Sequence, residues 1–230
     1  MTDAVLSRVH SETLAQAPGV LGRSTTWHSM AVRILDRSLS RLPTPLRTLI
    51  DWALTITVAA VAVLIFQAEV AKPYRIPSPS MEPTLHCAKP ADGCKSRVSD
   101  RVIANRLVYR FHQPKRGDII VFRAPPQVKA ACQAGGTFVK RIVGLPGEAV
   151  SMRAGHVFID GDRLSEPYLR PAYRAMESGI WPRSPSNGYF VLGDNRSMSC
   201  DSRRWGAVPR ENIIGRAEVT YWPPTRLGTP

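Results

Sequence analysis

The chain has 230 residues and a formal net charge of +13 at neutral pH, so it can hold an anchor plus one domain of ordinary size and should attract anions. No zinc-finger spacing, heptad-linked basic region or aromatic RNA-binding motif is present, which argues against nucleic acid as the partner. An anionic membrane surface fits this charge better, because the chain also contains one long apolar run.

Residues 1–48 carry scattered arginine, serine and threonine without sustained hydrophobic periodicity, and we interpret them as a flexible cytoplasmic tail. The apolar run that follows, about 20 residues long, would cross a hydrocarbon core of roughly 30 Å as a helix. We therefore expect an uncleaved transmembrane signal anchor over residues 49–70. A cleavable signal peptide is the alternative, but the run starts far from the N-terminus, and Glu69 and Val70 make a poor cleavage site.

Residues 71–230 consist largely of short β-type runs separated by Gly, Pro and Asp. We expect a strand or a bent pair of strands over residues 101–111 and a loop over residues 166–188. Further strands are expected at residues 118–122, 137–143, 149–152, 156–159, 189–192 and 213–222. The pattern predicts a single mostly β, antiparallel domain attached to one N-terminal transmembrane helix.

A proline-rich segment over residues 75–85 surrounds Ser80. Each proline fixes its own φ and pushes the preceding residue toward extended conformations, so the segment should be stiff and strand-like rather than helical. The two-residue period of a strand would then place the hydroxyls of Ser78 and Ser80 on one face. One hydroxyl could attack a substrate while the other donates a hydrogen bond. Clusters of proline and serine are also typical of linkers, and this segment alone leaves that reading open.

Lys140 lies in the apolar run 137–143 and would share a strand face with Phe138 and Ile142. Desolvation on such a face disfavours the ammonium and lowers the lysine pKa. A neutral lysine can accept the proton of a serine hydroxyl, which an arginine cannot do because it does not deprotonate. The alternative is a lysine whose amine reaches solvent from a sheet edge.

Residues 193–206 form a third informative segment, dense in Asp, Asn, Ser and Arg. These side chains bond to nearby backbone groups and build rigid turns, and Asp201 with Arg203 could form a local ion pair. A solvated loop is the simplest interpretation. A buried lysine base, however, needs a hydrogen-bond partner for its amine, and a rigid loop that bears serine could supply one.

The 4 cysteines lack the C-x-x-C spacing of a zinc site, which argues against a structural metal. Cys87 and Cys94 would close a short loop that a disulfide could staple in an oxidising compartment, and two free thiols fit the sequence equally well. The motifs of other hydrolases, G-x-S-x-G and H-E-x-x-H, are absent.

Taken together, residues 77–85, 116–122, 140–148 and 193–208 resemble the motifs of bacterial type I signal peptidase, a family of membrane-anchored serine-lysine proteases. The motifs occur in the family's order and cover about residues 73–222. The resemblance implies that Ser80 is the nucleophile and Lys140 the general base. It also implies that the Ser78 hydroxyl and the Ser80 backbone N–H form the oxyanion hole.

The resemblance assigns roles to further residues. Ser199 should orient Lys140 by a hydrogen bond, and Ile76 and Val139 should shape a shallow pocket for small side chains. The implied structural ion-pair residues are Arg141, Asp194, Asp201 and Arg203. No metal, nucleotide or organic cofactor is implied.

The resemblance also implies a substrate and an orientation. The substrate would be a signal-peptide-bearing preprotein, bound as an added strand so that Ala-x-Ala-like residues reach the nucleophile. The anchor would cross the bacterial cytoplasmic membrane once, with the N-terminus inside and the catalytic domain of residues 71–230 on the outer face. Two alternatives remain: a serine-lysine self-cleaving protease, and a catalytically inactive membrane-tethered binding module.

Overall fold

The computed structural model describes residues 43–230, so the predictions for residues 1–42 lie outside the described part of the chain. Helix α2 spans Thr44–Glu69 and begins five residues before the predicted anchor. Its segment Thr44–Leu64 is long and apolar enough to cross a membrane, and it is the one such helix among the described residues. Hydroxyls within it bond to the carbonyl four residues earlier, as in Thr55 to Asp51 at 2.8 Å, which hides their polarity from an apolar medium.

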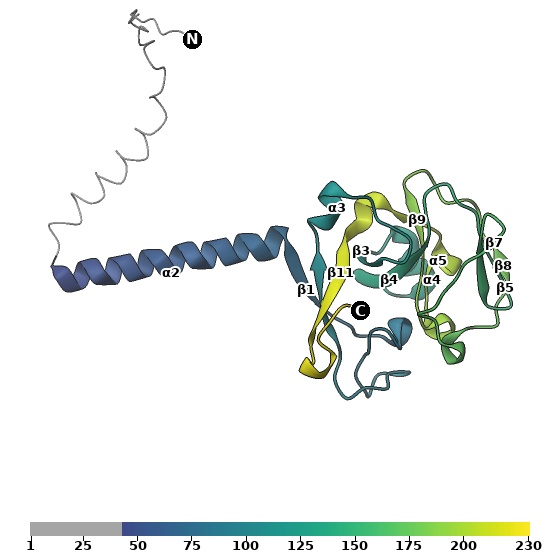
Figure 1. Cartoon of the computed structure of the whole chain (residues 1–230), viewed down its shortest axis with the longest axis horizontal. Helices are drawn as coiled ribbons and strands as arrows, with labels where there is room; N and C mark the ends of the chain where they lie inside the picture. Colours follow the sequence, from purple (N-terminus) through teal and green to yellow (C-terminus); the bar gives the residue numbers. More distant parts are fainter. Residues whose placement is uncertain (1–42) are drawn as a thin grey trace, which may run out of the picture. The chain divides into compact units, whose positions relative to one another are not determined.

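The chain divides into two units between Ala59 and Ala60, and the second, Ala60–Pro230, contains both β-sheets. Strands of the larger sheet follow the order β1-β2-β11-β3-β4-β9-β10, and neighbouring strands are antiparallel. Figure 1 labels β1, β11, β3, β4 and β9 of this sheet. These strands are β1 (Ala71–Arg75), β2 (Arg101–Asn105), β3 (Ile119–Arg123), β4 (Thr137–Gly144), β9 (Gly188–Leu192), β10 (Val208–Pro209) and β11 (Ile213–Trp222).

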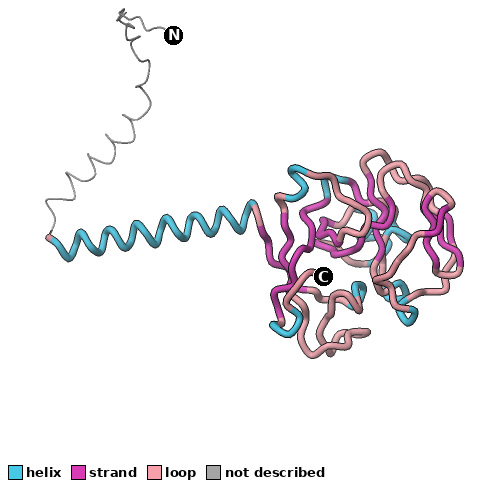
Figure 2. Tube along the Cα trace, viewed as in Figure 1, coloured by secondary structure: helices cyan, strands magenta, loops and turns pink. Residues whose placement is uncertain are grey.

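A smaller antiparallel sheet in the order β7-β6-β5-β8 is formed by the chain between β4 and β9. Its strands are β5 (Val150–Arg153), β6 (His156–Ile159), β7 (Asp162–Arg163) and β8 (Gly179–Ile180). Short helices connect the strands, and loops make up much of this part of the domain (Figure 2). The short helices of the whole domain are α3 (Val108–Phe111), α4 (Pro126–Cys132), α5 (Ser202–Trp205) and the 3₁₀ turns Pro79–Met81, Pro171–Tyr173, Arg196–Met198, Arg210–Asn212 and Pro224–Arg226. The prediction of a mostly β, antiparallel domain is confirmed.

Three hydrophobic clusters form the core of the domain. In the first, Met81 and Leu85 from the proline-rich segment pack with residues of β2 and β3. In the second, β3, β4 and β9 pack with Trp205 of α5. The third cluster joins the two sheets, because Val143 and Phe190 of the large sheet pack with β5 and β6. The proline-rich segment is therefore part of the core and is not a linker.

Two local predictions need correction. Residues 101–111 form strand β2 followed by helix α3, because the Asn105 side-chain oxygen accepts the N–H groups of Leu107 and Val108 at 2.9 and 3.2 Å and so begins a helical turn. The segment around Ser80 is extended only up to Ser78. Pro79–Met81 then forms a 3₁₀ turn, in which the Glu82 N–H bonds to the Pro79 carbonyl at 3.0 Å. Proline favours this position because its fixed φ suits the first helical residue.

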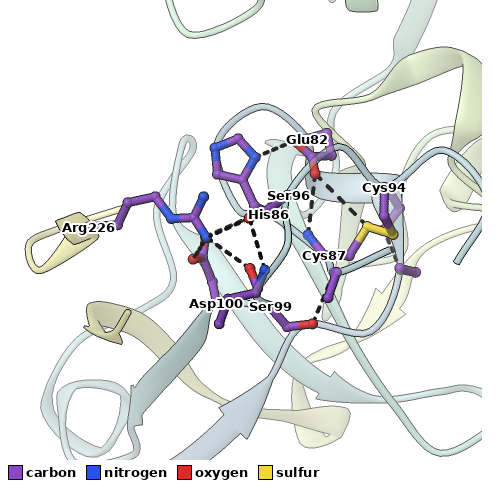
Figure 3. Close-up of a disulfide and its surroundings, with 12 residues drawn as sticks. Glu82, His86, Cys87, Cys94, Ser96, Ser99, Asp100 and Arg226 are labelled. Atoms are coloured by element: carbon purple, nitrogen blue, oxygen red, sulfur yellow. Dashed lines mark hydrogen bonds and ion pairs between the residues drawn. A yellow bond between two sulfur atoms is a disulfide. The ribbon is translucent and has the colours of Figure 1, made fainter. Parts of the chain in front are cut away.

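Two disulfides close loops of very different length. Cys87–Cys94 spans 7 residues of sequence, and its surroundings include Glu82, whose carboxylate oxygens bond to the Cys87 N–H at 3.3 Å and the His86 ring at 2.5 Å (Figure 3). Cys132–Cys200 spans 68 residues and joins the end of α4 to the residue after Ser199. No sequence motif indicated the second pairing.

The two disulfides should contribute unequally to stability, since the loop-closure entropy removed from the unfolded chain grows with loop length. We expect Cys132→Ala/Cys200→Ala to lower the free energy of unfolding by roughly 4 kcal/mol and Cys87→Ala/Cys94→Ala by roughly 2 kcal/mol. Denaturant titration of the detergent-solubilised full chain would measure both values. A larger loss for the Cys87–Cys94 pair would contradict the loop-length argument.

Candidate active site

Ser80 and Lys140 come from different elements and meet inside the domain. Ser80 lies in the turn Pro79–Met81, and Lys140 lies in the middle of β4, opposite Ile120 of β3. The Lys140 Nζ is 2.5 Å from the Ser80 Oγ, and the two residues are only 2 and 7% exposed. The structure thus brings together the two residues predicted as base and nucleophile, across 60 positions of sequence.

Burial changes the protonation of Lys140. Loss of hydration lowers its pKa from 10.5 to about 8, against the opposing pull of Asp201 and Asp194, while nearby Arg203 adds to the decrease. With this pKa, about one Lys140 in ten is neutral at pH 7. The neutral amine accepts a hydrogen bond from the Ser80 hydroxyl, whereas the ammonium donates one to it. This geometry therefore allows proton transfer in either direction.

Ser78 lies beside the nucleophile predicted from sequence. Its Oγ is 3.2 Å from the Ser80 Oγ, and its backbone is extended, with φ −128° and ψ 155°. The two hydroxyls are thus close although Ser80 lies within the 3₁₀ turn and Ser78 precedes it, and Ser78 is the more exposed of the two. A hydroxyl in this position can donate a hydrogen bond to a group that approaches Ser80 from solvent.

Ser199 is buried in the same region, but it does not bond to Lys140. Its Oγ has no hydrogen-bond partner among the described residues. Ser199 and Ser80 both lie against Gly193, where an added Cβ would be 2.3 Å from both the Ser199 Oγ and the Ser80 carbonyl oxygen. Ser199 therefore packs next to Ser80, and its predicted hydrogen bond to Lys140 is not present in this structure.

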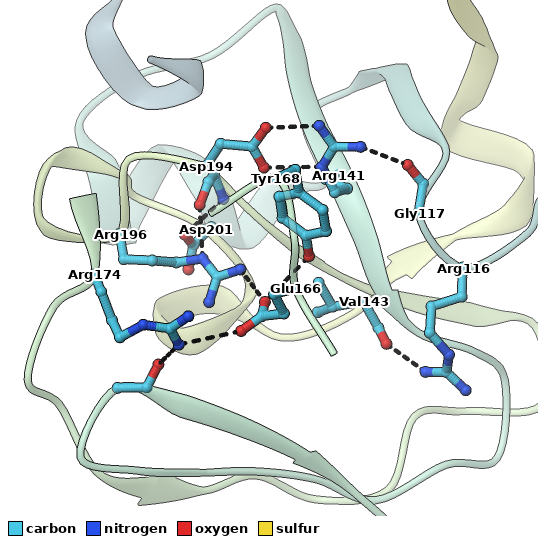
Figure 4. Close-up of polar contacts among 12 residues, drawn as sticks. Arg116, Gly117, Arg141, Val143, Glu166, Tyr168, Arg174, Asp194, Arg196 and Asp201 are labelled. Carbon is cyan, nitrogen blue, oxygen red and sulfur yellow. Dashed lines mark hydrogen bonds and ion pairs between the residues drawn. The ribbon is translucent and has the colours of Figure 1, made fainter. Parts of the chain in front are cut away.

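The predicted ion-pair residues fall into two pairs. Arg141 Nε and Nη2 donate to the two oxygens of Asp194 at 2.9 and 2.7 Å (Figure 4). Asp194 also accepts the Thr84 hydroxyl at 2.5 Å, so one carboxylate ties β4 to the segment that carries Ser80. Asp201 and Arg203 pair at 2.8 Å, and Asp201 accepts the Gly193 N–H at 3.1 Å.

A second buried network was missed by sequence reasoning. Glu166 accepts hydrogen bonds from Arg196, from Arg174 at 3.4 Å and from the Tyr168 hydroxyl at 3.1 Å (Figure 4). The Arg141 guanidinium lies 4.1 Å from the centre of the Tyr168 ring. Glu166 lies in the segment predicted to be a loop, which is largely irregular. An isolated glutamate in such a segment carries no signal of burial.

A groove of about 410 Å³ opens onto Ser80 and Lys140. Ile76 and Val139, the two residues predicted to shape a substrate pocket, both line it. Its remaining walls come from the segment 74–81 and from residues 134–138 before and within β4. The groove lies between the segment 74–81 and residues 134–140, and its volume is sufficient for a peptide side chain.

The close approach at Gly193 generates a test. Gly193→Ala should lower the free energy of unfolding by about 1–3 kcal/mol, because the new methyl group overlaps the Ser199 hydroxyl and a backbone carbonyl that cannot move freely. Adding Ser199→Ala should recover part of this loss, and Ser199→Ala alone serves as the control. Thermal unfolding of the three variants would measure the effect. Wild-type stability of Gly193→Ala would contradict the packing.

Comparison with known proteins places the chain in a family. Residues 49–222 match the family model described as "Signal peptidase, peptidase S26". A signal peptidase I of Leptolyngbya laminosa is 42% identical over 177 residues, which cover 76% of this chain and 80% of the relative. Signal peptidase I of Mycobacterium tuberculosis (strain CDC 1551 / Oshkosh) is 34% identical over an alignment of 231 residues, which covers 81% of this chain and 76% of the relative.

A solved structure, a signal peptidase I from Enterococcus faecalis V583, is 34% identical and covers 46% of this chain and 97% of its own, with a TM-score of 0.39. The family assignment rests on the extent of the family match and on the identity to the relatives. The chain belongs to the signal peptidase family, peptidase S26.

Proposed function

We propose that this serine endopeptidase removes N-terminal signal peptides from exported preproteins. Membership of the peptidase S26 family and the relatives named signal peptidase I support this function. The observation that carries the chemistry is the contact of 2.5 Å between the Ser80 Oγ and the buried Lys140 Nζ. A binding module without catalysis would gain nothing from an amine with a lowered pKa beside a serine hydroxyl.

In the proposed mechanism, the neutral Lys140 amine takes the proton of Ser80 as its Oγ attacks the scissile carbonyl carbon. The tetrahedral oxyanion receives hydrogen bonds from the Ser78 hydroxyl and the Ser80 backbone N–H. The Lys140 ammonium then protonates the leaving amine, and an acyl-enzyme ester remains on Ser80. Lys140 next deprotonates a water molecule that hydrolyses this ester and regenerates the serine.

The remaining predicted residues have supporting roles in this proposal. Arg141 and Asp194 hold β4 against the segment that carries Ser80, and Asp201 and Arg203 brace the loop that contains Ser199. Ser199, buried beside Gly193, helps to fix the position of the Ser80 segment by packing. Each residue acts on the position of the Ser80–Lys140 pair and not on the substrate.

The substrate proposal follows from the groove. A preprotein lies extended along the groove, and the side chains next to its scissile bond point toward Ile76 and Val139. These apolar side chains would contact small apolar groups of the substrate, and we expect Ala-x-Ala-like cleavage sites, as the family resemblance implies.

The location proposal rests on α2 and on the disulfides. Helix α2 anchors the protein in the cytoplasmic membrane, with residues 1–48 inside and the catalytic domain outside. The two disulfides support this orientation, because such bonds persist in oxidising compartments and are rare in the reducing cytosol.

Removal of either member of the pair should abolish cleavage. We expect Ser80→Ala and Lys140→Ala each to lower kcat by at least about a thousandfold, since nucleophile and base act as a unit. The assay would follow cleavage of a preprotein with an Ala-x-Ala site by the detergent-solubilised full chain. Ser165→Ala and Lys115→Ala, at exposed positions, are matched controls. Equal cleavage by all five proteins would exclude this mechanism.

The proposed base also determines the pH dependence. Cleavage requires neutral Lys140, so kcat/KM should rise about tenfold per pH unit below the Lys140 pKa of about 8 and level off above it. Stopped assays on an uncharged peptide substrate between pH 6 and pH 10 would record the profile. A rate that does not change between mildly acidic and mildly alkaline pH would be incompatible with a lysine base.

A further inference from the structure

Three cationic side chains lie close together at the C-terminal end of β1. In the β-ladder, Arg75 of β1 lies opposite Arg101 of β2, and Arg101 lies opposite Trp222 of β11. Directly opposed residues point to the same face of a sheet, so Arg75, Arg101 and Trp222 form one row across three strands. Together with Arg97 from the preceding loop, they line a pocket of about 210 Å³, which we call the arginine pocket.

The protein leaves this charge uncompensated. Like charges directly opposed across a sheet destabilise it, and a counter-ion on the same chain would normally relieve the repulsion. In the described part of the chain, no acidic side chain lines the arginine pocket, and none of the three arginines forms an ion pair or side-chain hydrogen bond. An external anion can supply the missing charge.

Asp100, the acidic residue next to Arg101, has other partners. Its carboxylate pairs with Arg226 at 2.5 Å and accepts the His86 backbone N–H at 2.7 Å (Figure 3). Asp100 is also buried, with 1% of its surface exposed. It therefore cannot neutralise the exposed arginines of the pocket, whose charges face solvent.

Exposed apolar side chains surround the same arginines. Val98 and Trp222 line the pocket and are 42 and 43% exposed. Leu227, 69% exposed, follows Arg226, whose Nη2 donates to the Val98 carbonyl at 3.1 Å. An aromatic ring and aliphatic groups flanked by arginine are typical of a surface that enters the headgroup layer of a membrane. A site for a free inorganic anion would not need them.

The chain also limits how far this pocket can lie from the anchor. Arg75 follows the last residue of α2, Glu69, by six positions, and an extended segment of that length spans at most about 22 Å. We propose that Arg75, Arg97 and Arg101 bind the phosphate of an anionic phospholipid, with Trp222 at the depth of the headgroups. This inference rests on the proposed membrane anchoring by α2. Because Arg75 also lines the catalytic groove, a bound lipid would place the groove near the bilayer surface.

Lipid binding can be measured without catalysis. The detergent-solubilised full chain would be titrated with dioctanoyl phosphatidylglycerol, dioctanoyl phosphatidylcholine or inorganic phosphate, and the bound species counted by native mass spectrometry. We expect phosphatidylglycerol to bind at least about tenfold more tightly than phosphatidylcholine. Arg97→Gln/Arg101→Gln should lower the affinity for phosphatidylglycerol about 30-fold, at about fivefold per cation.

Two further variants control for charge and folding. Lys115→Gln/Arg153→Gln removes the same charge from exposed positions elsewhere and should leave lipid affinity unchanged. Arg97→Gln alone, in a loop outside the strands, should lower the affinity about fivefold and guards against misfolding of the double variant.

Three results would overturn the proposal: equal affinity for the two lipids, inorganic phosphate that binds as tightly as phosphatidylglycerol, or an Arg97→Gln/Arg101→Gln variant that loses only cleavage of substrates with acidic residues. The last result would assign the pocket to the preprotein. Cleavage of an uncharged Ala-x-Ala peptide by the same preparations reports separately on the proposed protease activity.

Discussion

The burial of one amine constrains the rest of this domain. Lys140 sits in the middle of β4 with its charge removed from water, and the decrease of its pKa to about 8 corresponds to a cost of about 3 kcal/mol for the folded state at neutral pH. Since the ammonium is favoured in the unfolded chain, this cost is complete below about pH 8 and fades as the pH rises toward 10.5. In the proposed mechanism the same desolvation makes the lysine a base, so stability and chemistry would oppose each other at this residue.

The surrounding structure offsets that cost and holds the pair in place. Asp194 joins Arg141 of β4 to Thr84, four residues after Ser80, so a single carboxylate links the strand of the lysine to the segment of the serine. The Cys132–Cys200 disulfide fastens the loop that contains Ser199. The Glu166 network ties the connection between β7 and β8 to the same loop through Arg196. Small displacements at any of these contacts would change the distance between Ser80 and Lys140, on which the proposed proton transfer depends.

Sequence reasoning succeeded where a local pattern has one physical outcome. The apolar run before residue 70 predicted a helix, and alternation around residues 137–143 predicted the strand that carries Lys140. It failed where a single side chain favours a backbone conformation that differs from the one the surrounding pattern predicts. Asn105 capped a helical turn inside an apparently continuous β pattern, and Pro79 began a 3₁₀ turn in a segment expected to be extended. Cys132 and Cys200 could not be paired from sequence, because three connectivities are open to four cysteines.

By itself, the sequence predicted the fold class, an apolar helix long enough to cross a membrane, and the serine and lysine that we propose as nucleophile and base. These predictions were possible because hydrophobic periodicity and proline act over a few residues, and because the family's motifs occur in a fixed order. Only the tertiary structure decided that the Ser80 and Lys140 side chains meet at 2.5 Å in a buried site. It also decided that Ser199 packs against Gly193 without a bond to the amine, and that Arg75 and Arg101 face each other. Those facts depend on strand register and side-chain burial across long sequence separations, which no local pattern encodes.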